Sequence, residues 1–276
     1  MQCAILQLNV SDDPVANLAI TLDMFRKAVA QGAQFILTPE VTNCVSTSRA
    51  HQQEVLQFEA DDITLAALRA EAKAAGVWLL IGSLGLKTGD ADKRFANRSF
   101  MIGPDGGIVA KYDKIHMFDV QISETETWRE SEGYRPGDRA VLARTDFAKI
   151  GMSVCYDVRF SHLYRALAKA GAQILTVPAA FSPVTGAAHW HALLRARAIE
   201  SGCFVIAPAQ TGTHASAVHK TRDTYGHSLV VDPWGEVLLD AGTASGVYTF
   251  ALDMEKGEAA RRKVPSLANA RDFSGP

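Results

Sequence analysis

The sequence has no excess of charge of either sign, with 28 lysines and arginines against 30 aspartates and glutamates in 276 residues. It contains no basic block that would bind a phosphate backbone, so we expect no nucleic-acid partner. The longest strongly apolar stretch, residues 76–82, is far shorter than the roughly 20 residues that a membrane-spanning helix needs. We therefore also expect no membrane partner.

Secretion and disulfide signals are also missing. The N-terminal residues MQCAILQLNV lack the basic region and the small-residue cleavage site of a secretory signal, so we expect a cytoplasmic location. The four cysteines, Cys3, Cys44, Cys155 and Cys203, form no CxxC pair and have no zinc-finger spacing. This argues against a disulfide framework and against a zinc site. Cys3 and Cys203 adjoin apolar runs and are predicted to be buried and structural.

The composition is that of a globular protein, with 47% hydrophobic and 21% charged residues. Strands are expected at residues 3–10, 35–38, 77–81, 98–102, 107–112, 149–154, 173–177, 203–207, 228–231, 237–240 and 246–252, and helices at 14–31, 65–75, 160–170 and 187–201. Residues 119–139 are polar and predict a long functional loop. The alternation indicates one α/β domain over residues 1–276, but it does not distinguish two packed sheets from one doubly wound sheet.

Three of the apolar runs lead to chemically reactive residues. Glu40 follows residues 35–39, Lys114 follows residues 108–113, and Cys155 follows residues 150–154. Strand ends at one rim of a sheet converge, so these side chains are candidates for one site. A carboxylate can take the thiol proton, and an ammonium can stabilise an oxyanion. Taken singly, each residue also fits a structural role, as a loop carboxylate, a surface lysine or a buried thiol.

Together the three segments resemble the nitrilase superfamily of carbon–nitrogen hydrolases. The resemblance is carried by residues 36–40 (ILTPE), 111–120 (KYDKIHMFDV) and 153–160 (SVCYDVRF). Residues 178–181 (PAAF), 185–190 (TGAAHW), 194–200 (LRARAIE) and 224–228 (TYGHS) are similar to the amidase branch that contains omega-amidases and deaminated glutathione amidases. The resemblance runs almost end to end. It implies a single-domain, four-layer α-β-β-α sandwich that assembles as a homodimer or a higher homo-oligomer.

The resemblance also implies a role for each matched residue. It makes Cys155 the nucleophile, Glu40 the general base and Lys114 the oxyanion partner. A second glutamate before the Pro-Gly pair corresponds to Glu130, with Glu132 as a nearby rival that is more easily explained as solvated. The backbone N–H of Tyr156 would be the other oxyanion donor. The chemistry needs no metal and no cofactor.

Substrate binding is implied for three further residues. In the omega-amidase-like branch, residues matching Arg159, Phe181 and Thr185 are associated with a substrate carboxylate, and an arginine fork suits that group. A helix-surface ion pair for Arg159 and core packing for Phe181 are the structural alternatives. Ser161 and His162 stand where the family commonly has Pro-Glu. The closing stretch also lacks the usual Arg-Arg-Pro-like ending.

The expected activity is hydrolysis of a small carboxylate-bearing amide to an acid and ammonia through a cysteine thioester. A deaminated glutathione amidase-like enzyme is the first hypothesis, and an omega-amidase on α-keto acid amides or an N-carbamoyl amino acid amidohydrolase is the alternative. A non-catalytic scaffold on the same fold has no need of the intact Glu40, Lys114 and Cys155 set.

Histidines offer a second interpretation of the cysteine. His116 or His227 could pair with Cys155 as a papain-like dyad, but no papain signature surrounds this cysteine. His189 and His191 are two residues apart on an expected helix, so they face different sides and are disfavoured as metal ligands.

Overall fold

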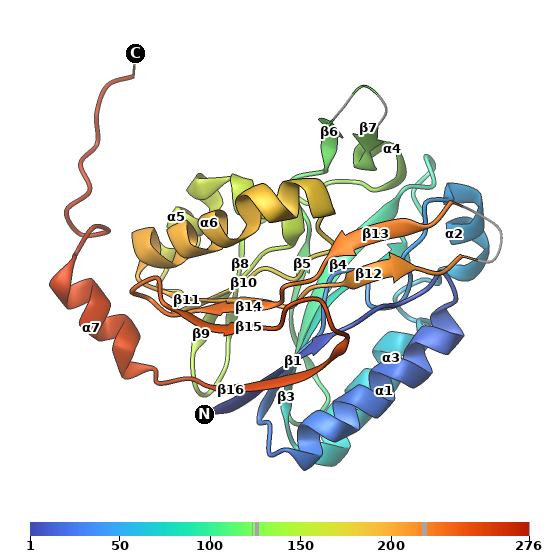
Figure 1. Cartoon of the computed structure of the whole chain (residues 1–276), viewed down its shortest axis with the longest axis horizontal. Coiled ribbons are helices and arrows are strands. Elements are labelled where there is room, and N and C mark those ends of the chain that lie inside the picture. Colours follow the sequence, from blue (N-terminus) through green and yellow to red (C-terminus); the bar gives the residue numbers. More distant parts are fainter. Residues whose placement is uncertain (123, 125–126, 217–219, 276) are drawn as a thin grey trace.

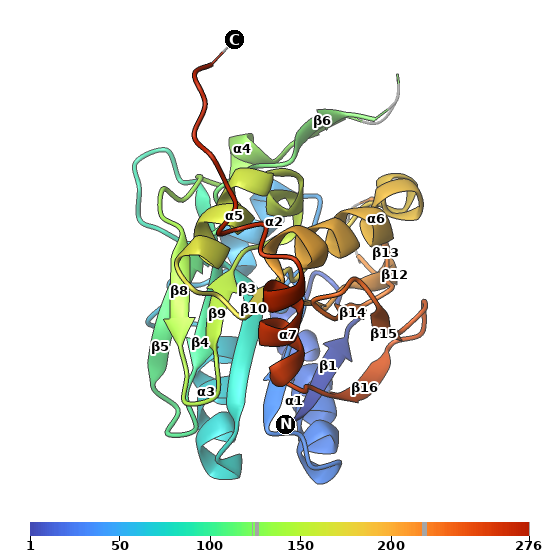
Figure 2. The same cartoon turned by 90° about the vertical axis from the view of Figure 1, so that its left-hand side faces the viewer.

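Two six-stranded sheets pack face to face, with helices on both outer surfaces (Figures 1 and 2). The computed structural model describes residues 1–122, 124, 127–216 and 220–275. The first sheet has the order β16-β1-β2-β3-β4-β5, and the second has the order β15-β14-β11-β10-β9-β8. This is the expected four-layer α-β-β-α sandwich, which the periodicity of the sequence could not select by itself.

The first sheet consists of β1 (Gln2–Gln7), β2 (Phe35–Leu37), β3 (Trp78–Lys87), β4 (Phe95–Ile102), β5 (Ile108–Asp113) and β16 (Gly246–Ala251). The second consists of β8 (Val141–Arg144), β9 (Lys149–Met152), β10 (Ile174–Thr176), β11 (Phe204–Ala207), β14 (Leu229–Val231) and β15 (Val237–Asp240). In both sheets the central strands pair in parallel, and the pairs towards the edges are antiparallel. The parallel centres and antiparallel edges agree with the α/β class that the alternation of strands and helices predicted.

Helices cover the two outer faces. Helices α1 (Pro14–Ala30) and α3 (Ile63–Ala75) pack on the first sheet, and α5 (Ser161–Lys169) and α6 (Pro183–Ser201) pack on the second. The smaller elements are α2 (Arg49–Val55), α4 (Glu130–Gly133), η1 (Cys155–Arg159), α7 (Glu255–Lys263), and the hairpins β6 (Asp119–Gln121) with β7 (Thr127–Arg129) and β12 (Thr211–His214) with β13 (Arg222–Tyr225). In the described part of the chain, no helix has both the length and the apolar character to cross a bilayer.

Strand periodicity distributes side chains between two cores. Cys3 and Ile5 of β1 face the core between the sheets, whereas Ala4 and Leu6 face the core under α1 and α3. Successive side chains of a strand point to opposite faces, so a strand buried on both sides reads as a continuous apolar run. This explains why the central strands were recognisable from sequence.

Local signals set several helix boundaries. The Asp13 carboxylate accepts hydrogen bonds from the N–H groups of Val15 and Ala16 and caps α1. Gly76 ends α3 in the left-handed conformation, with φ of +65°, directly after the helix expected at residues 65–75. Both the cap and the stop follow from residue types that a single sequence displays.

Other boundaries differ from the expectation. Residues 119–139 were expected to be an irregular loop, but they contain β6, β7 and α4. Helix α6 begins at Pro183 rather than at residue 187, since proline is favoured in the first turn of a helix. Strand β3 extends to Lys87, and α2, β8, β12 and β13 were not expected. The hairpin strands β12 (TGTH) and β13 (RDTY) carry too few apolar residues for a periodic signal.

Candidate active site

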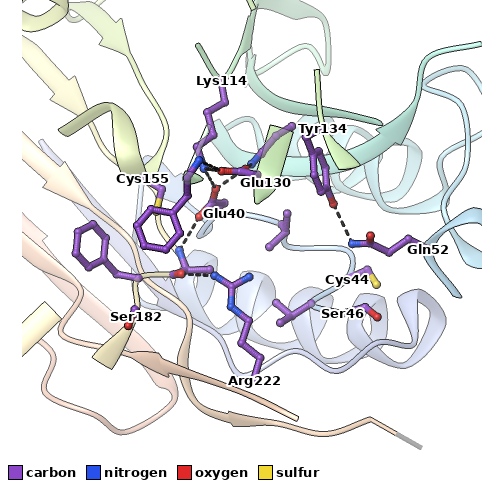
Figure 3. Close-up of a pocket in the computed structure, with 16 residues that line it drawn as sticks. Glu40, Cys44, Ser46, Gln52, Lys114, Glu130, Tyr134, Cys155, Ser182 and Arg222 are labelled. Atoms are coloured by element: carbon purple, nitrogen blue, oxygen red, sulfur yellow. Dashed lines mark hydrogen bonds and ion pairs between the residues drawn. The ribbon is translucent and has the colours of Figure 1, made fainter. Parts of the chain in front are cut away.

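Glu40, Lys114 and Cys155 line one cavity, although they lie on three separate segments (Figure 3). Glu40 follows β2, Lys114 follows β5, and Cys155 follows β9 and opens η1. The cavity encloses about 620 Å³ of unfilled space, part of it open to solvent. The two sheets thus bring together the carboxylate, ammonium and thiol that the strand ends predicted.

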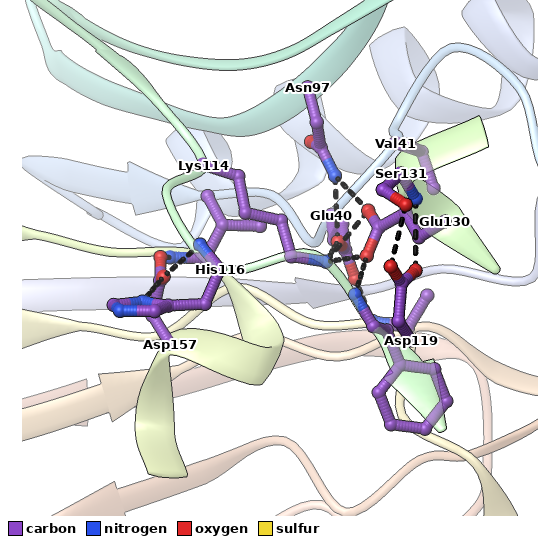
Figure 4. Close-up of polar contacts among 12 residues, drawn as sticks. Glu40, Val41, Asn97, Lys114, His116, Asp119, Glu130, Ser131 and Asp157 are labelled. Atoms are coloured by element: carbon purple, nitrogen blue, oxygen red, sulfur yellow. Dashed lines mark hydrogen bonds and ion pairs between the residues drawn. The ribbon is translucent and has the colours of Figure 1, made fainter. Parts of the chain in front are cut away.

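Lys114 lies between two carboxylates (Figure 4). Its Nζ is 2.9 Å from Glu40 Oε1 and 2.9 and 2.8 Å from the two carboxylate oxygens of Glu130. The Lys114 side chain is 2% exposed. Glu130 also accepts a hydrogen bond from the Phe118 amide, whereas Glu132 is exposed. Of the two glutamates weighed from the sequence, Glu130 is the one in the cavity.

The segment that carries Glu130 is held in place by contacts with the adjoining β6–β7 hairpin. Asp119 in β6 accepts hydrogen bonds from the amide and the hydroxyl of Ser131, which directly follows Glu130. The Glu130 amide donates to the Phe118 carbonyl. These contacts fix the start of α4 and aim the Glu130 carboxylate at Lys114.

Asn97 joins the two carboxylates from the middle of β4, and sequence reasoning missed it. Its Nδ2 donates to Glu40 Oε1 at 2.8 Å and to Glu130 Oε1 at 3.4 Å. The other Glu40 oxygen, Oε2, accepts from the Ala180 amide at 2.8 Å. Asn97 stands just before the strand expected at residues 98–102, and one sequence gives no sign that its side chain faces the cavity.

The environment keeps the ion pair charged and the thiol neutral. Burial alone would raise the pKa of Glu40, but Lys114, Arg222 and Asn97 bring it below its ordinary value. Burial alone would lower the pKa of Lys114, but the neighbouring carboxylates raise it well above the usual range. Burial and the Glu40 carboxylate raise the pKa of Cys155, against the opposing effect of Lys114. The site therefore holds a protonated thiol beside an ionised carboxylate, which is the starting state for general-base activation.

The backbone at Cys155 is strained. Cys155 has φ of +49°, a region that favours glycine, and its amide donates to the Pro178 carbonyl at 2.8 Å. The next residue, Tyr156, lies in the first turn of η1, where amide N–H groups have no partner within the helix. Such sharp strand-to-helix turns present a nucleophile and an N–H donor together.

Asp157 ties the cysteine turn to the lysine segment. Its Oδ1 accepts from the amide of His116 at 3.0 Å, and its Oδ2 accepts from the Val154 amide and from the hydroxyl of Tyr112 at 2.8 and 2.6 Å. The His116 ring nitrogen Nδ1 lies 2.7 Å from the same carboxylate. Asp157 is fully buried, so these contacts hold the two segments in a fixed relation.

The residues predicted to contact substrate, which are Tyr156 through its backbone N–H and Arg159, Phe181 and Thr185, have different positions. Phe181 lines the cavity, whereas Tyr156, Arg159 and Thr185 are not among the lining residues. The Arg159 guanidinium lies 5.7 Å from the centre of the Phe181 ring, and its Nη2 is 3.2 Å from His189 Nδ1. Arg159 therefore contacts Phe181, a residue of the cavity wall, without lining the cavity itself. The Oγ1 of Thr185 is buried without a hydrogen-bond partner among the described residues.

The histidines do not support the dyad interpretation. His116 pairs with Asp157, and His227 Nδ1 lies 2.9 Å from Asp240. Neither histidine lines the cavity of Cys155. His191 also contacts Asp240, at 2.9 Å, so it faces away from His189. Ligand atoms of His191, His227 and Asp240 lie within 4.8 Å of one another at the surface, where the hydrogen bonds to the carboxylate account for the grouping.

A buried Cys–Glu–Lys cluster at the rims of two stacked sheets defines a thiol hydrolase class rather than a binding module. The family model for carbon-nitrogen hydrolases matches residues 2–262. The chain therefore belongs to the carbon-nitrogen hydrolase family. A relative from Yersinia enterocolitica, a deaminated glutathione amidase, is 36% identical over 98% of this chain and 93% of its own length. The Bos taurus omega-amidase NIT2 is 34% identical over 97% and 94%.

Solved structures agree with this placement. The NitFhit protein of C. elegans superposes with a TM-score of 0.90 at 32% identity over 98% of this chain, which spans 65% of that longer protein. A glutamate-to-glutamine variant of the amidase from Nesterenkonia sp. AN1 matches with a TM-score of 0.77 at 25% identity, over 96% of this chain and 98% of its own. That structure shows the Michael addition of acrylamide at the active site cysteine. Homologues and structural neighbours thus support an amidase with a cysteine nucleophile.

Proposed function

We propose that this chain is an amidase that cleaves a small carboxylate-bearing amide, with deaminated glutathione as the first candidate substrate. The observation that supports it most is the shared cavity of Cys155, Glu40 and Lys114. The names of the relatives support the amide class and this candidate. An amide of an α-keto acid or an N-carbamoyl amino acid is the alternative substrate within the same chemistry.

Acylation begins with the thiol. The ionised Glu40 takes the Sγ proton of Cys155 while sulfur bonds to the amide carbon, and the carbonyl electron pair moves to oxygen. The oxyanion accepts hydrogen bonds from Lys114 Nζ and from the Tyr156 amide. Collapse of this intermediate breaks the C–N bond, and Glu40 returns its proton to the leaving nitrogen. A primary amide releases ammonia, and an N-substituted amide releases an amine.

Deacylation repeats the proton transfers with water. Glu40, again ionised, takes a proton from water as the water oxygen bonds to the thioester carbon. The second tetrahedral intermediate uses the same donors, and its collapse breaks the C–S bond. Glu40 then returns the proton to sulfur and the acid leaves. Glu130 takes no proton in this scheme. It holds Lys114 charged and in place, so we assign it as a positioning residue.

The direct test is a substrate panel with two readouts. Purified protein is incubated with deaminated glutathione, α-ketoglutaramate, an N-carbamoyl amino acid and a simple nitrile, and both the acid and the released ammonia or amine are measured. The proposal expects turnover of at least one carboxylate-bearing amide, and little or none of the nitrile. Turnover of the nitrile alone, or of no compound, contradicts it.

We further infer a cytoplasmic, single-domain protein of residues 1–276 that forms a homodimer or a higher homo-oligomer. Family resemblance is the main support. An apolar patch supports assembly, because Ile199, Trp234 and Val264 line one cavity and are 53%, 59% and 57% exposed. Light scattering of the purified protein is expected to give a mass of at least twice 29.8 kDa. Trp234→Arg is expected to reduce that mass, and a monomeric wild-type protein contradicts the inference.

A further inference from the structure

Arg222 presents a second cation to the cavity, on the hairpin strand β13 (Figure 3). Its Nη2 donates to the Ala180 carbonyl at 2.7 Å, and its guanidinium carbon lies 5.0 Å from the centre of the Trp128 ring. No carboxylate of the described residues pairs with it. A guanidinium carries five N–H donors in a fixed fork, so donors are left for a ligand.

The wall of the same cavity also contains a hydroxyl group that has no hydrogen-bond partner among the described residues. Ser182 lines the cavity and is 8% exposed, yet its Oγ has no hydrogen-bond partner in the described part of the chain. Ser182 is the N-cap residue of α6, but its side chain does not cap the helix. A buried hydroxyl without a partner is costly, so it is expected where a ligand completes it.

The helix adds to the positive potential. Helix α6 has 19 residues, and its N-terminus starts at this wall with Pro183, which carries no N–H. The positive end of a helix dipole favours an anion, although it would not make a site by itself. Here it coincides with the Arg222 guanidinium and the unpartnered Ser182 hydroxyl.

The charged groups of the cavity indicate which kind of ligand this part of it binds. Lys114 already contacts two carboxylates, Glu40 and Glu130, so it has no unbalanced charge to offer a substrate anion. Arg222 also lines the cavity and forms no ion pair with a carboxylate of the described residues, although its charge helps to lower the pKa of Glu40. A planar carboxylate suits a guanidinium fork, and its second oxygen can accept from a hydroxyl. We propose that Arg222 and Ser182 form the subsite that binds the carboxylate of the amide substrate.

This inference rests on the proposed amidase function and refines it. It gives the specificity role to Arg222 rather than to Arg159, which contacts Phe181 but does not line the cavity. Through the Ala180 peptide, whose amide donates to Glu40 and whose carbonyl accepts from Arg222, the subsite adjoins the carboxylate that protonates the leaving nitrogen. The carboxylate can belong to the acyl group or to the leaving amine, and matched substrates distinguish these sources.

The test compares each charged substrate with its neutral methyl ester in Arg222→Gln, Arg222→Lys and the control Arg159→Gln. One pair carries the carboxylate on the acyl group and the other on the leaving amine. Arg222→Gln is expected to lower kcat/KM about 10–100-fold for one charged substrate, mainly through KM, and to change its ester by less than about threefold. Arg222→Lys is expected to recover part of the loss. Ser182→Ala should show a smaller loss of the same kind.

The opposite pattern overturns the inference. Equal losses for charged and neutral substrates would show that Arg222 only supports the structure, and loss of charge discrimination in Arg159→Gln alone would move the subsite to Arg159. Calorimetry measures the binding of both charged amides without turnover. The proteins compared are Cys155→Ala and the double variant that also carries Arg222→Gln. Weaker binding on loss of Arg222 supports the subsite even if the amidase proposal fails, whereas unchanged binding rejects the subsite even if amides are hydrolysed. Thermal unfolding checks that each variant is folded.

Discussion

Lys114 donates to Glu40 across 2.9 Å inside the protein, where the two side chains are 2% and 5% exposed and 74 positions separate them in the chain. Removing one partner of such a pair leaves an uncompensated buried charge, so the pair is costly to break. Glu130 supplies the second carboxylate, which allows Lys114 to stay charged even when Glu40 is protonated during the reaction. The arrangement therefore separates the two functions, with one carboxylate moving protons and the other holding the cation.

Loss of the Lys114 ammonium is expected to abolish most of the rate. An oxyanion donor contributes about 3–4 kcal/mol to transition-state stabilisation, so Lys114→Gln should lower kcat by at least about 100-fold. The exposed pair of Lys111 with Glu59 provides the matched control, and Lys111→Gln is expected to retain wild-type kcat. Steady-state kinetics on the best amide of the panel gives the answer, and comparable rates in the two variants would reject the oxyanion role.

The pH profile should depend on Asn97. Glu40 must be ionised to accept the thiol proton, and its pKa lies below the ordinary 4.5, so activity should persist at neutral pH and fall only as pH drops through that lowered pKa. Asn97→Ala removes a donor to the carboxylate, which raises the pKa of Glu40 and moves the acid limb of kcat/KM to higher pH. Gln52→Ala, which removes another cavity-lining amide that instead contacts Tyr134, should leave the limb in place. If the acid limb of the kcat/KM profile stays at the same pH in Asn97→Ala, the result contradicts the assignment of Glu40 as the general base.

Asp157 is expected to hold the site together without touching substrate. In Asp157→Asn the amide group would face N–H and O–H donors that now bond to a carboxylate. The free energy of unfolding should fall by about 2–4 kcal/mol, and kcat should fall more than KM changes. Denaturant unfolding measures the first effect. The exposed Asp146 gives the control variant Asp146→Asn, and equal stability of the two variants would contradict the role.

His214 makes stability depend on pH outside the active site. It is 1% exposed, its ring lies between the Val10 carbonyl and the Thr224 hydroxyl, and burial lowers its pKa to about 4. The unfolded chain binds this proton near pH 6.5 and the folded protein only near pH 4, so stability is full above pH 6.5 and falls as pH drops between these values. The loss amounts to about 3 kcal/mol.

Unfolding curves between pH 7 and 4 test this dependence. His214→Gln is expected to be less stable at neutral pH but to lose less stability on acidification than the wild type. Substitution of the exposed His189 should leave the wild-type slope unchanged. A wild-type slope in His214→Gln would show that another group takes up the proton.

Residues that end strands were predictable, and residues that reach the site from within an element were not. Glu40, Lys114 and Cys155 each stand after an apolar run, so the sheet rims bring them together, and Glu130 was carried by the family resemblance. Asn97 lies within β4 and Arg222 begins a short polar strand. Their roles depend on which face of a strand meets the cavity and on pairing with distant segments, and neither leaves a local pattern in one sequence.

The central claim is that the acyl group is carried on the sulfur of residue 155. Mass spectrometry of protein quenched during turnover, followed by peptide mapping, tests it most directly. The account predicts an acyl mass on the peptide containing Cys155 and none on those of Cys3, Cys44 or Cys203. It also predicts a folded but inactive Cys155→Ala. An acyl group on another residue, or full activity of Cys155→Ala, would contradict it.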